Sequence, residues 1–257
     1  MASVSSNRDK SGAAMHKADE PVAPVRVFNA KGRGPFVLAV DHASNRIPEP
    51  YGTLGLTPIQ RLMHIAWDPG AFDVALRLSD MLDVPLVAST VSRLVVDCNR
   101  APDAADLVPR LAERTEIPGN LKVTDADRID RIARYHSPFH AALALVLAER
   151  PEAALIAVHS FTPVFKGKPR PWPVGILPGA DPAFSERLAM ALRAGVPDLN
   201  LGWNEPYRSG LGVTYTLDHH GRDRRATMLE IRHDEILSLP GIALWSGRLG
   251  AALHAAL

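Results

Sequence analysis

The chain has 257 residues, 46% hydrophobic and 22% charged, the proportions of an ordinary globular protein able to bury a substantial core. Its formal net charge of +1 gives no electrostatic reason to expect a nucleic acid or an anionic membrane as a partner. The single cysteine, Cys98, excludes an intramolecular disulfide and suits the reducing cytoplasm. No apolar run approaches the roughly 20 residues that a membrane-spanning helix needs.

The N-terminal segment, residues 1–24, is predicted to be a disordered tail, because it is rich in Ser, Ala, Lys and Asp and lacks the apolar segment of a secretory signal. In residues 25–257, apolar runs of strand length alternate with helical stretches, without an internal repeat or a linker. We therefore expect a single α/β domain with a largely parallel sheet and helices on both faces.

Two short apolar runs, at 35–40 and 153–158, are each followed by a histidine. Buried parallel strands are continuous apolar runs of this kind, and ligands bind beyond the carboxyl ends of such strands. His42 and His159 are therefore expected at one site, with Ser160 beside them, since histidine is the commonest metal ligand and a frequent general base. The alternative for His42 is that it only caps the turn that follows.

Residues 58–82 are predicted to form two helical segments that break at Trp67–Gly70, where proline and glycine interrupt the apolar period. We expect Asp68 to cap the second helix, with Pro69 at its first position. A role of Asp68 as a metal ligand is compatible with that capping role.

Further strands are predicted at 85–90 and 94–96. Arg93 and Arg100 flank the second of these strands, and each guanidinium offers a planar fork that suits a carboxylate. We expect Asp97 to form a structural ion pair with one arginine, which leaves the other free.

The segment 102–118 is typical of a surface excursion that could cover a site, and 127–150 predicts a long helix with a wide apolar stripe. His136 and His140 stand four residues apart, hence on one face of that helix, but no Glu follows His136, so the metalloprotease motif is absent. We interpret both as packing residues or as supports behind the site.

The rest of the chain continues the α/β pattern. We expect a basic, proline-rich loop at 166–173, which could steer an anionic substrate. A strand at 174–177 and a helix at 182–194 follow it, and then an apolar run at 213–217 that ends in Asp218–Gly221. The last elements are a strand at 227–232, which carries Glu230, and a closing helix within 233–257 with Pro240 and Gly241 in its early part.

Polar side chains that suit metal-assisted hydrolysis collect at these strand ends and turns. They are His42, Asp68, His159, His220 and Glu230, with Arg93, Asn99 and Arg100 nearby. Two histidines and a carboxylate are a common catalytic zinc set with a fourth position open for water, on which a separate glutamate can act as general base. Arginines would hold a substrate carboxylate. Together, these parts favour hydrolysis of an amide whose amine product is an acidic or simple amino acid.

Six segments, in order over nearly the whole chain from about residue 35 to 237, resemble those of the N-formylglutamate amidohydrolases. They are Asp41–Pro48, Trp67–Ala71, Ser92–Arg100, Val158–Pro163, Asn204–Tyr207 and Leu229–Arg232. The resemblance implies a zinc-carboxypeptidase-like three-layer α/β sandwich with a mixed, mostly parallel central sheet. It also implies one zinc ion and hydrolysis of N-formyl-L-glutamate to formate and L-glutamate, a step of histidine breakdown.

Carried over to this sequence, the resemblance implies that His42 and His159 are zinc ligands and that Glu230 is the general base. Asn99 and Arg100 resemble the pair that holds a substrate carboxylate in related carboxypeptidases. Those enzymes place a glutamate three residues after the first ligand histidine, where this chain has Asn45. We therefore expect Asp68 as the third ligand, with Asp41 and Asn45 as the alternatives.

The expected substrate contacts are Arg93, Asn99, Arg100, Ser160 and His220. The expected partner is a small N-acyl amino acid, with no nucleic acid or membrane, and the expected location is the cytoplasm. Two alternatives remain open. One is a related hydrolase of N-acyl amino acids or small peptides, and the other is a metal-free ligand-binding module that kept the fold.

Overall fold

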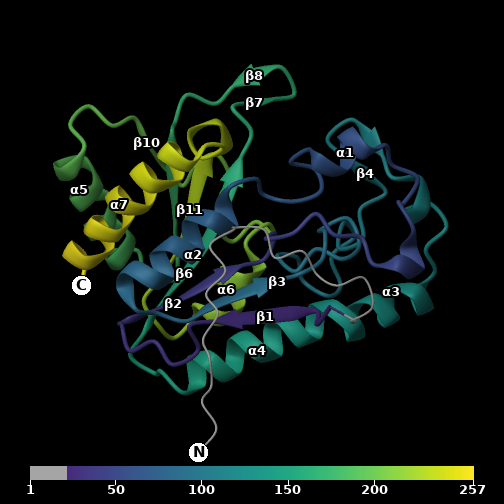
Figure 1. The fold of residues 1–257 in the computed structure, drawn as a ribbon, viewed down its shortest axis with the longest axis horizontal. Helices are drawn as coiled ribbons and strands as arrows, with labels where there is room; N and C mark the ends of the chain where they lie inside the picture. The colour runs from purple at the N-terminus through teal and green to yellow at the C-terminus, as the bar shows by residue number, and fades with distance from the viewer. Residues whose placement is uncertain (1–21) are drawn as a thin grey trace, which may run out of the picture.

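A seven-stranded sheet forms the centre of the protein in the computed structural model, which describes residues 22–257 (Figure 1). Most of the predicted tail, residues 1–21, lies outside the described residues. Across the sheet the strands are β1 (Val25–Phe28), β3 (Leu86–Ser89), β2 (Phe36–Val40), β6 (Ala154–Phe161), β11 (Ala226–Arg232), β9 (Val174–Pro178) and β10 (Leu201–Trp203). Strand β2 runs parallel to β3 and β6, β11 parallel to β6, and β10 parallel to β9. Strands β1 and β9 run antiparallel to β3 and β11, so the sheet is mixed but mostly parallel.

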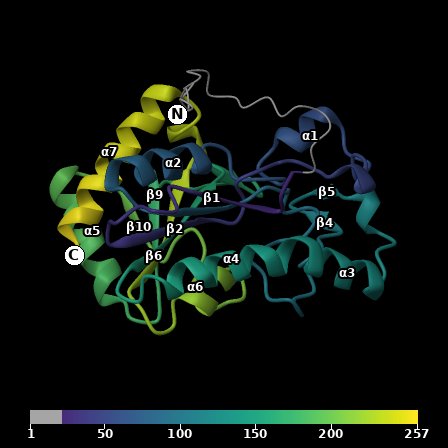
Figure 2. The ribbon, with the colours of Figure 1, turned by 60° about the horizontal axis from the view of Figure 1, so that its bottom comes forward.

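Helices cover both faces of this sheet (Figure 2). One layer contains α2 (Ala71–Leu82), α5 (Ala183–Gly195) and α7 (Leu239–Ala255), and the other contains α3 (Asp125–Arg131), α4 (Ser137–Ala148) and α6 (Tyr215–His220). A π-helical turn, Ile132–His136, joins α3 to α4. The predicted three-layer α/β sandwich with a mixed, mostly parallel sheet is therefore confirmed.

The alternation of side chains along the central strands explains why these strands are continuous apolar runs. In β2, Phe36, Leu38 and Val40 pack into the core under α2, α5 and α7. Val37 and Ala39 pack into the core under α4. Because both faces are covered, every residue of β2 and of β6 is buried.

Shorter elements surround the sheet. They are helix α1 (Pro58–Leu62), 3-10 turns at Glu49–Tyr51, Pro118–Asn120 and His233–Glu235, the hairpin of β4 (Leu111–Ala112) and β5 (Thr115–Glu116), and the hairpin of β7 (Val164–Phe165) and β8 (Lys168–Pro169). Among residues 22–257, no helix is both long and apolar enough to cross a membrane.

Two sequence-based expectations about elements were wrong, one for residues 94–96 and one for the end of strand β6. Residues 94–96 form a buried turn, because Leu94 and Val95 pack against Leu54 and Ile117 rather than pairing with a strand. The run at 213–217 leads into helix α6. Strand β6 continues two residues beyond His159, so that histidine lies within the strand.

Asp68 does not cap helix α2. The helix begins at Ala71, and its N-cap is Gly70, which has φ 79°. A side chain at Gly70 would collide with the backbone of Ile236, so the sharp entry into α2 requires glycine. The Asp68 carboxylate accepts a hydrogen bond from the backbone N–H of Ser160 instead. Strands β1 and β10, at the two edges of the sheet, were not predicted.

Candidate metal and active site

Three adjacent strands change from apolar to charged along one face of the sheet. On the α4 side of β2, β6 and β11, the inward positions begin with Val37, Leu155 and Ala226, and continue through Ala39, Ala157 and Met228. The next positions in the same alternation are Asp41, His159 and Glu230. Glu230 and His159 are direct register partners across the parallel pair of β11 and β6. The polar site therefore lies at the carboxyl ends of these strands, where ligands bind in α/β sheets.

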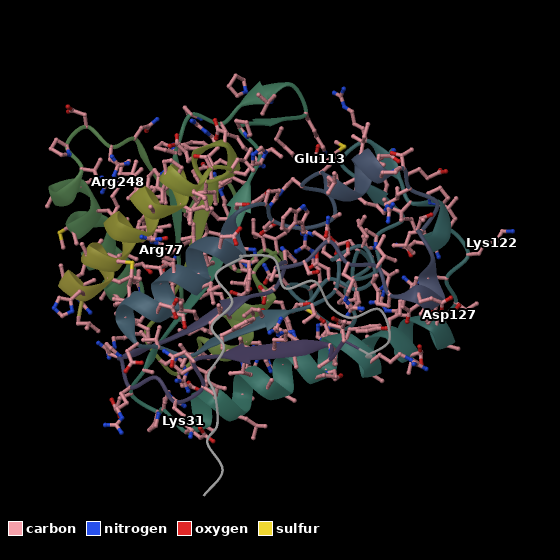
Figure 3. All side chains as sticks on the ribbon, in the orientation of Figure 1. Lys31, Arg77, Glu113, Lys122, Asp127 and Arg248 are labelled. Atoms are coloured by element: carbon pink, nitrogen blue, oxygen red, sulfur yellow. The ribbon has the colours of Figure 1, made fainter. Side chains whose placement is uncertain are left out.

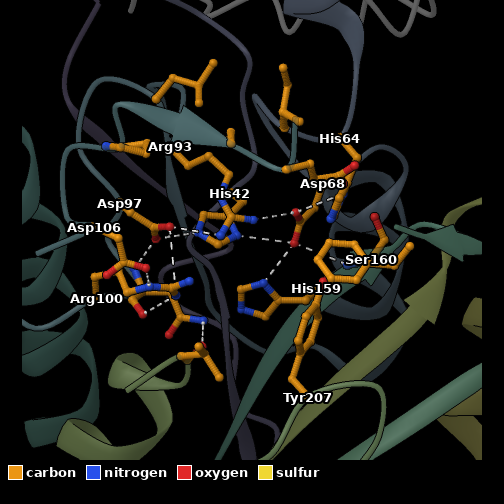
Figure 4. A pocket seen from close by; sticks show the side chains of 18 of the residues that line it. His42, His64, Asp68, Arg93, Asp97, Arg100, Asp106, His159, Ser160 and Tyr207 are labelled. Atoms are coloured by element: carbon orange, nitrogen blue, oxygen red, sulfur yellow. Dashed lines mark hydrogen bonds and ion pairs between the residues drawn. The ribbon is translucent and has the colours of Figure 1, made fainter. Parts of the chain in front are cut away.

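A pocket of about 230 Å³ opens at this point (Figure 4). Its base contains His42, Asp68, His159 and Glu230, and its walls come from the loops around Arg93–Arg100 and Asp106–Glu113. Glu113, labelled in Figure 3, lies on the turn between β4 and β5 at the rim. The predicted excursion at 102–118 thus contributes to the pocket.

His42, Asp68 and His159 converge at the base. One donor atom from each residue lies within 4.8 Å of the others, and all three side chains are buried. The Nδ1 atom of His159 lies 2.8 Å from Oδ2 of Asp68, and Nδ1 of His42 lies 3.4 Å from the same oxygen. Asp68 is held there because its backbone N–H donates to the carbonyl of His42.

Each of these histidines has a second buried carboxylate on its other nitrogen. Nε2 of His42 lies 2.7 Å from Oδ1 of Asp97, and Nε2 of His159 lies 3.0 Å from Oδ2 of Asp41. An imidazole that donates its Nε2–H to a carboxylate presents Nδ1 to the centre. Carboxylate, histidine and metal follow one another in this order in many metalloenzymes.

The donor set fits a divalent cation. Burial disfavours a charged His159, but its hydrogen bonds to Asp41 and Asp68 prevail and hold the pKa of His159 well above its usual value. A metal ion would take the place of that proton. The buried Oδ1 of Asp68 makes no hydrogen bond among the described residues, and it lies 3.5 Å from Nδ1 of His64 and 3.6 Å from Nη1 of Arg93. Two imidazoles and a carboxylate are donors that zinc accepts.

Glu230 is the isolated carboxylate of the pocket. Its side chain is buried, and Oε2 has no hydrogen-bond partner within residues 22–257. Burial raises the pKa of Glu230 to about 7, with His159 opposing the shift. A carboxylate poised near neutrality beside a candidate metal centre can accept and return a proton.

The structure places the expected substrate contacts in two groups. Arg93, Asn99, Arg100 and Ser160 all line the pocket, but His220 does not. The His220 ring stacks on His140, with Nε2 lying 3.0 Å from Nδ1 of that residue, behind the site. The apolar run before His220 forms helix α6 rather than a strand, so its end points away from the strand ends.

Several predicted contacts are already engaged within the protein. Asp97 pairs with Arg93 at 2.9 Å, as expected for one arginine, but Arg100 is not free, because it pairs with Asp106 at 2.8 Å. The Asn99 amide donates to the Val213 carbonyl and accepts from the backbone N–H of Thr216, which ties it to α6.

The hydroxyl of Ser160 donates to the carbonyl of Pro69 and thereby fixes the loop that carries Asp68. Of the two alternative third ligands, Asp41 accepts from His159 and from the Thr216 hydroxyl, and Asn45 donates to the Arg61 carbonyl. The geometry therefore supports Asp68.

Sequence reasoning missed three pocket residues, His64, Tyr207 and Asp106. Tyr207 lies in one of the six segments that resemble the family, so the sequence did point to it. His64 precedes Asp68 by one helical turn, a spacing that could have been noted. Asp106 lies in an irregular loop, and nothing in its neighbourhood marks it.

The fold and the site define an α/β protein with a candidate metal centre in a pocket at the strand ends. The sequence profile of the N-formylglutamate amidohydrolase family matches residues 34–237, and the chain belongs to this family. A search of curated proteins gave no significant match.

Two solved structures share the fold of this chain. A gene product of Agrobacterium tumefaciens is 36% identical, with a TM-score of 0.87 over 91% of this chain and 95% of that chain. An N-formylglutamate amidohydrolase from Ralstonia eutropha is 19% identical, with a TM-score of 0.67 over 91% of this chain and 97% of that chain, and so shares the fold.

Proposed function

We propose that this chain hydrolyses the amide bond of N-formyl-L-glutamate to give formate and L-glutamate, in a metal-dependent reaction that serves histidine breakdown in the cytoplasm. Family membership supports the reaction class. The observation that carries the mechanism is the unpartnered Oε2 of Glu230, which shares the pocket base with the convergent group of His42, Asp68 and His159.

His42, Asp68 and His159 would hold one divalent ion, for which zinc is the choice that suits these donors. Bound zinc supplies Lewis-acid chemistry, which polarises a carbonyl and acidifies water. The chain itself directs Nδ1 of both histidines to one point, because Asp97 and Asp41 bind the Nε2 atoms. Burial opposes ionisation of Asp97, but Arg93 and His42 prevail and hold its pKa well below the usual value, so Asp97 stays anionic.

Glu230 moves the proton in this proposal. Its carboxylate takes a proton from the attacking water while the water oxygen bonds to the formyl carbon. The same carboxylic acid then gives its proton to the amide nitrogen as the C–N bond breaks, so that L-glutamate leaves through its amino group. The formyl carbon leaves as formic acid, which ionises to formate. A pKa of about 7 suits a group that must both take and return a proton.

Arg93 and Arg100 are proposed to attract the carboxylates of the substrate, with Asn99 and Ser160 shaping the same wall. The rim also carries apolar side chains, Leu111, Phe165 and Val213. These apolar contacts favour a second candidate, a related hydrolase of other N-acyl amino acids or small peptides.

A substrate screen separates these candidates. Zinc-loaded protein is expected to show a higher kcat/KM for N-formyl-L-glutamate than for N-formyl-L-leucine, N-acetyl-L-glutamate or a dipeptide. A chelator should abolish this activity, and zinc should restore it. A preference for leucine would contradict the arginine clamp, and full activity after complete metal removal would contradict the metal mechanism. No hydrolysis of any compound would favour a binding module.

A further inference from the structure

Arg100 and Asp106 form an ion pair in the wall of the pocket. Nε of Arg100 donates to Oδ2 of Asp106 at 2.8 Å, and both residues line the pocket. The two partners differ in exposure: the Arg100 side chain is 13% exposed and that of Asp106 is 61% exposed. The cation therefore belongs to the pocket wall, whereas its carboxylate partner is largely exposed to solvent. Figure 4 shows Arg100 and Asp106 side by side.

Asp106 accepts from only one of the N–H donors of the Arg100 guanidinium. Nη1 of Arg100 donates to the carbonyl of Asn99 at 3.2 Å, and Nη2 makes no hydrogen bond within residues 22–257. Nε and Nη2 form one edge of the guanidinium fork, and a carboxylate that approaches this edge can accept from both. Asp106 accepts from Nε alone. A ligand carboxylate could thus replace it with a two-point contact.

The Asp106 side chain can leave without disturbing the loop. The following residues, Leu107 and Val108, are buried, and the carbonyl of Leu107 accepts from the backbone N–H of Asp97 at 2.8 Å. The chain is therefore fixed on one side of Asp106, and rotation of one exposed side chain is sufficient. Asp97 has no such freedom, because His42, Arg93 and the backbone of Asn99 all donate to it.

We infer that Asp106 occupies the position on Arg100 that one carboxylate of the substrate takes, and that it is a specificity-determining residue. This inference rests on the proposed function, which it deepens. Exposed ion pairs are weak, so an acidic ligand with two-point geometry displaces Asp106 at a cost of at most about fivefold in affinity. A ligand without that carboxylate cannot replace Asp106 as the hydrogen-bond acceptor for Arg100, so the pair of Arg100 and Asp106 stays intact.

The test is a calorimetric titration of the metal-loaded protein with L-glutamate, the product of the proposed reaction. The variants are Asp106→Asn, Arg100→Gln, the double variant, and Asp103→Asn as the matched control, an exposed acid of the same loop. We expect Asp106→Asn to bind L-glutamate about three- to fivefold more tightly, because Arg100 then loses its nearest carboxylate and keeps only Asp97, whose Oδ2 lies 3.9 Å from Nη1. Arg100→Gln should bind more weakly, and Asp103→Asn should match the unsubstituted protein.

The double variant shows whether Asp106 acts through Arg100. In the Arg100→Gln background, Asp106→Asn should have no effect, since the two residues act through one contact. The improvement should also appear as a lower KM for N-formyl-L-glutamate rather than as a higher kcat. Unchanged or weaker binding by Asp106→Asn, tighter binding that persists without Arg100, or no L-glutamate binding by any variant would overturn the inference.

The same data distinguish the inference from the proposed function. If L-glutamate binding follows the expected pattern but N-formyl-L-glutamate is not hydrolysed, the proposed reaction fails and the inference stands. If hydrolysis proceeds while Asp106→Asn binds L-glutamate no better, the inference alone fails.

Discussion

The base and the rim of the pocket are built in different ways. Around the two histidines of the base, Asp41, Asp68 and Asp97 are buried, and each of these carboxylates accepts from at least two groups of the protein. At the rim, Asp106 is exposed and has a single partner, and Glu113 lies on an exposed turn. Over-determined side chains hold geometry, whereas loosely held ones adapt to a ligand. We therefore expect the buried groups to fix the chemistry and the exposed loops to set the choice of substrate.

The largest effect should come from the base, where Glu230→Gln removes the proton acceptor and keeps the shape. We expect kcat for N-formyl-L-glutamate to fall by about 10²–10⁴-fold while the metal content is retained, because Glu230 is outside the ligand group. His159→Ala should lose both the metal and the activity. Turnover and metal analysis on the same samples provide the check, and near-full activity of Glu230→Gln would remove the glutamate from the mechanism.

A smaller effect is expected for Asp41, which accepts a hydrogen bond from the proposed ligand His159. Asp41→Asn weakens the acceptor for Nε2–H of His159 and sets an amide against the Thr216 hydroxyl, which donates to Asp41 at 2.8 Å. Metal affinity should fall by about 10- to 100-fold. A competition titration with a zinc-binding dye measures it, with Asp80→Asn on the exposed side of α2 as control. Equal affinity in the two variants would mean that Asp41 does not position His159.

The smallest effect concerns pH and the histidines behind the base. Burial, with His136 next, lowers the pKa of His140 to about 3, and burial, with His219 next, lowers that of His220 to about 4. Asp41 opposes both shifts. These rings are neutral in the folded protein but titrate near pH 6.5 when unfolded, so the stability they contribute is present above about pH 6.5 and is lost as the pH falls toward 3 to 4.

For His140 alone, the free energy of unfolding should fall by at most about 1.4 kcal/mol per pH unit in that window. Urea unfolding between pH 4.5 and 7.5 measures the slope. His140→Gln should flatten it, whereas Asp106→Asn at the rim should leave it unchanged. An equal slope in His140→Gln and the unsubstituted protein would contradict the assignment.

Site residues at or near the ends of apolar runs were predictable, whereas the partners that distant loops bring to them were not. Apolar runs covered on both faces are visible in sequence, which is why β2, β6, β9 and β11 were found and why His159 and Glu230 were placed near a common edge. The edge strands β1 and β10 are short and partly exposed, so no such run marks them. The turn at 94–96 was mistaken for a strand because it is equally buried and equally apolar.

The details of pairing depend on contacts between distant segments. Asp97 was expected to pair with an arginine, but its bond to His42 spans 55 residues and leaves no local pattern. The same holds for Asp41 and Thr216, which are 175 residues apart. Asp68 was expected both to cap α2 and to serve as a metal ligand; its carboxylate contacts His42 and His159 rather than capping α2.

The direct pairing of Glu230 with His159 across β11 and β6 has a consequence for how this protein tolerates insertions. Backbone hydrogen bonds of the sheet set the spacing between Glu230, the proposed proton acceptor, and His159, the proposed metal ligand. A shift by one residue would turn Glu230 to the opposite face. A single inserted residue within 226–229 should therefore abolish turnover. Several residues added to the turn at 112–115 should change only which amino acids are accepted. Proteins that share this sheet can then differ in substrate through loop length alone, while the reaction stays the same.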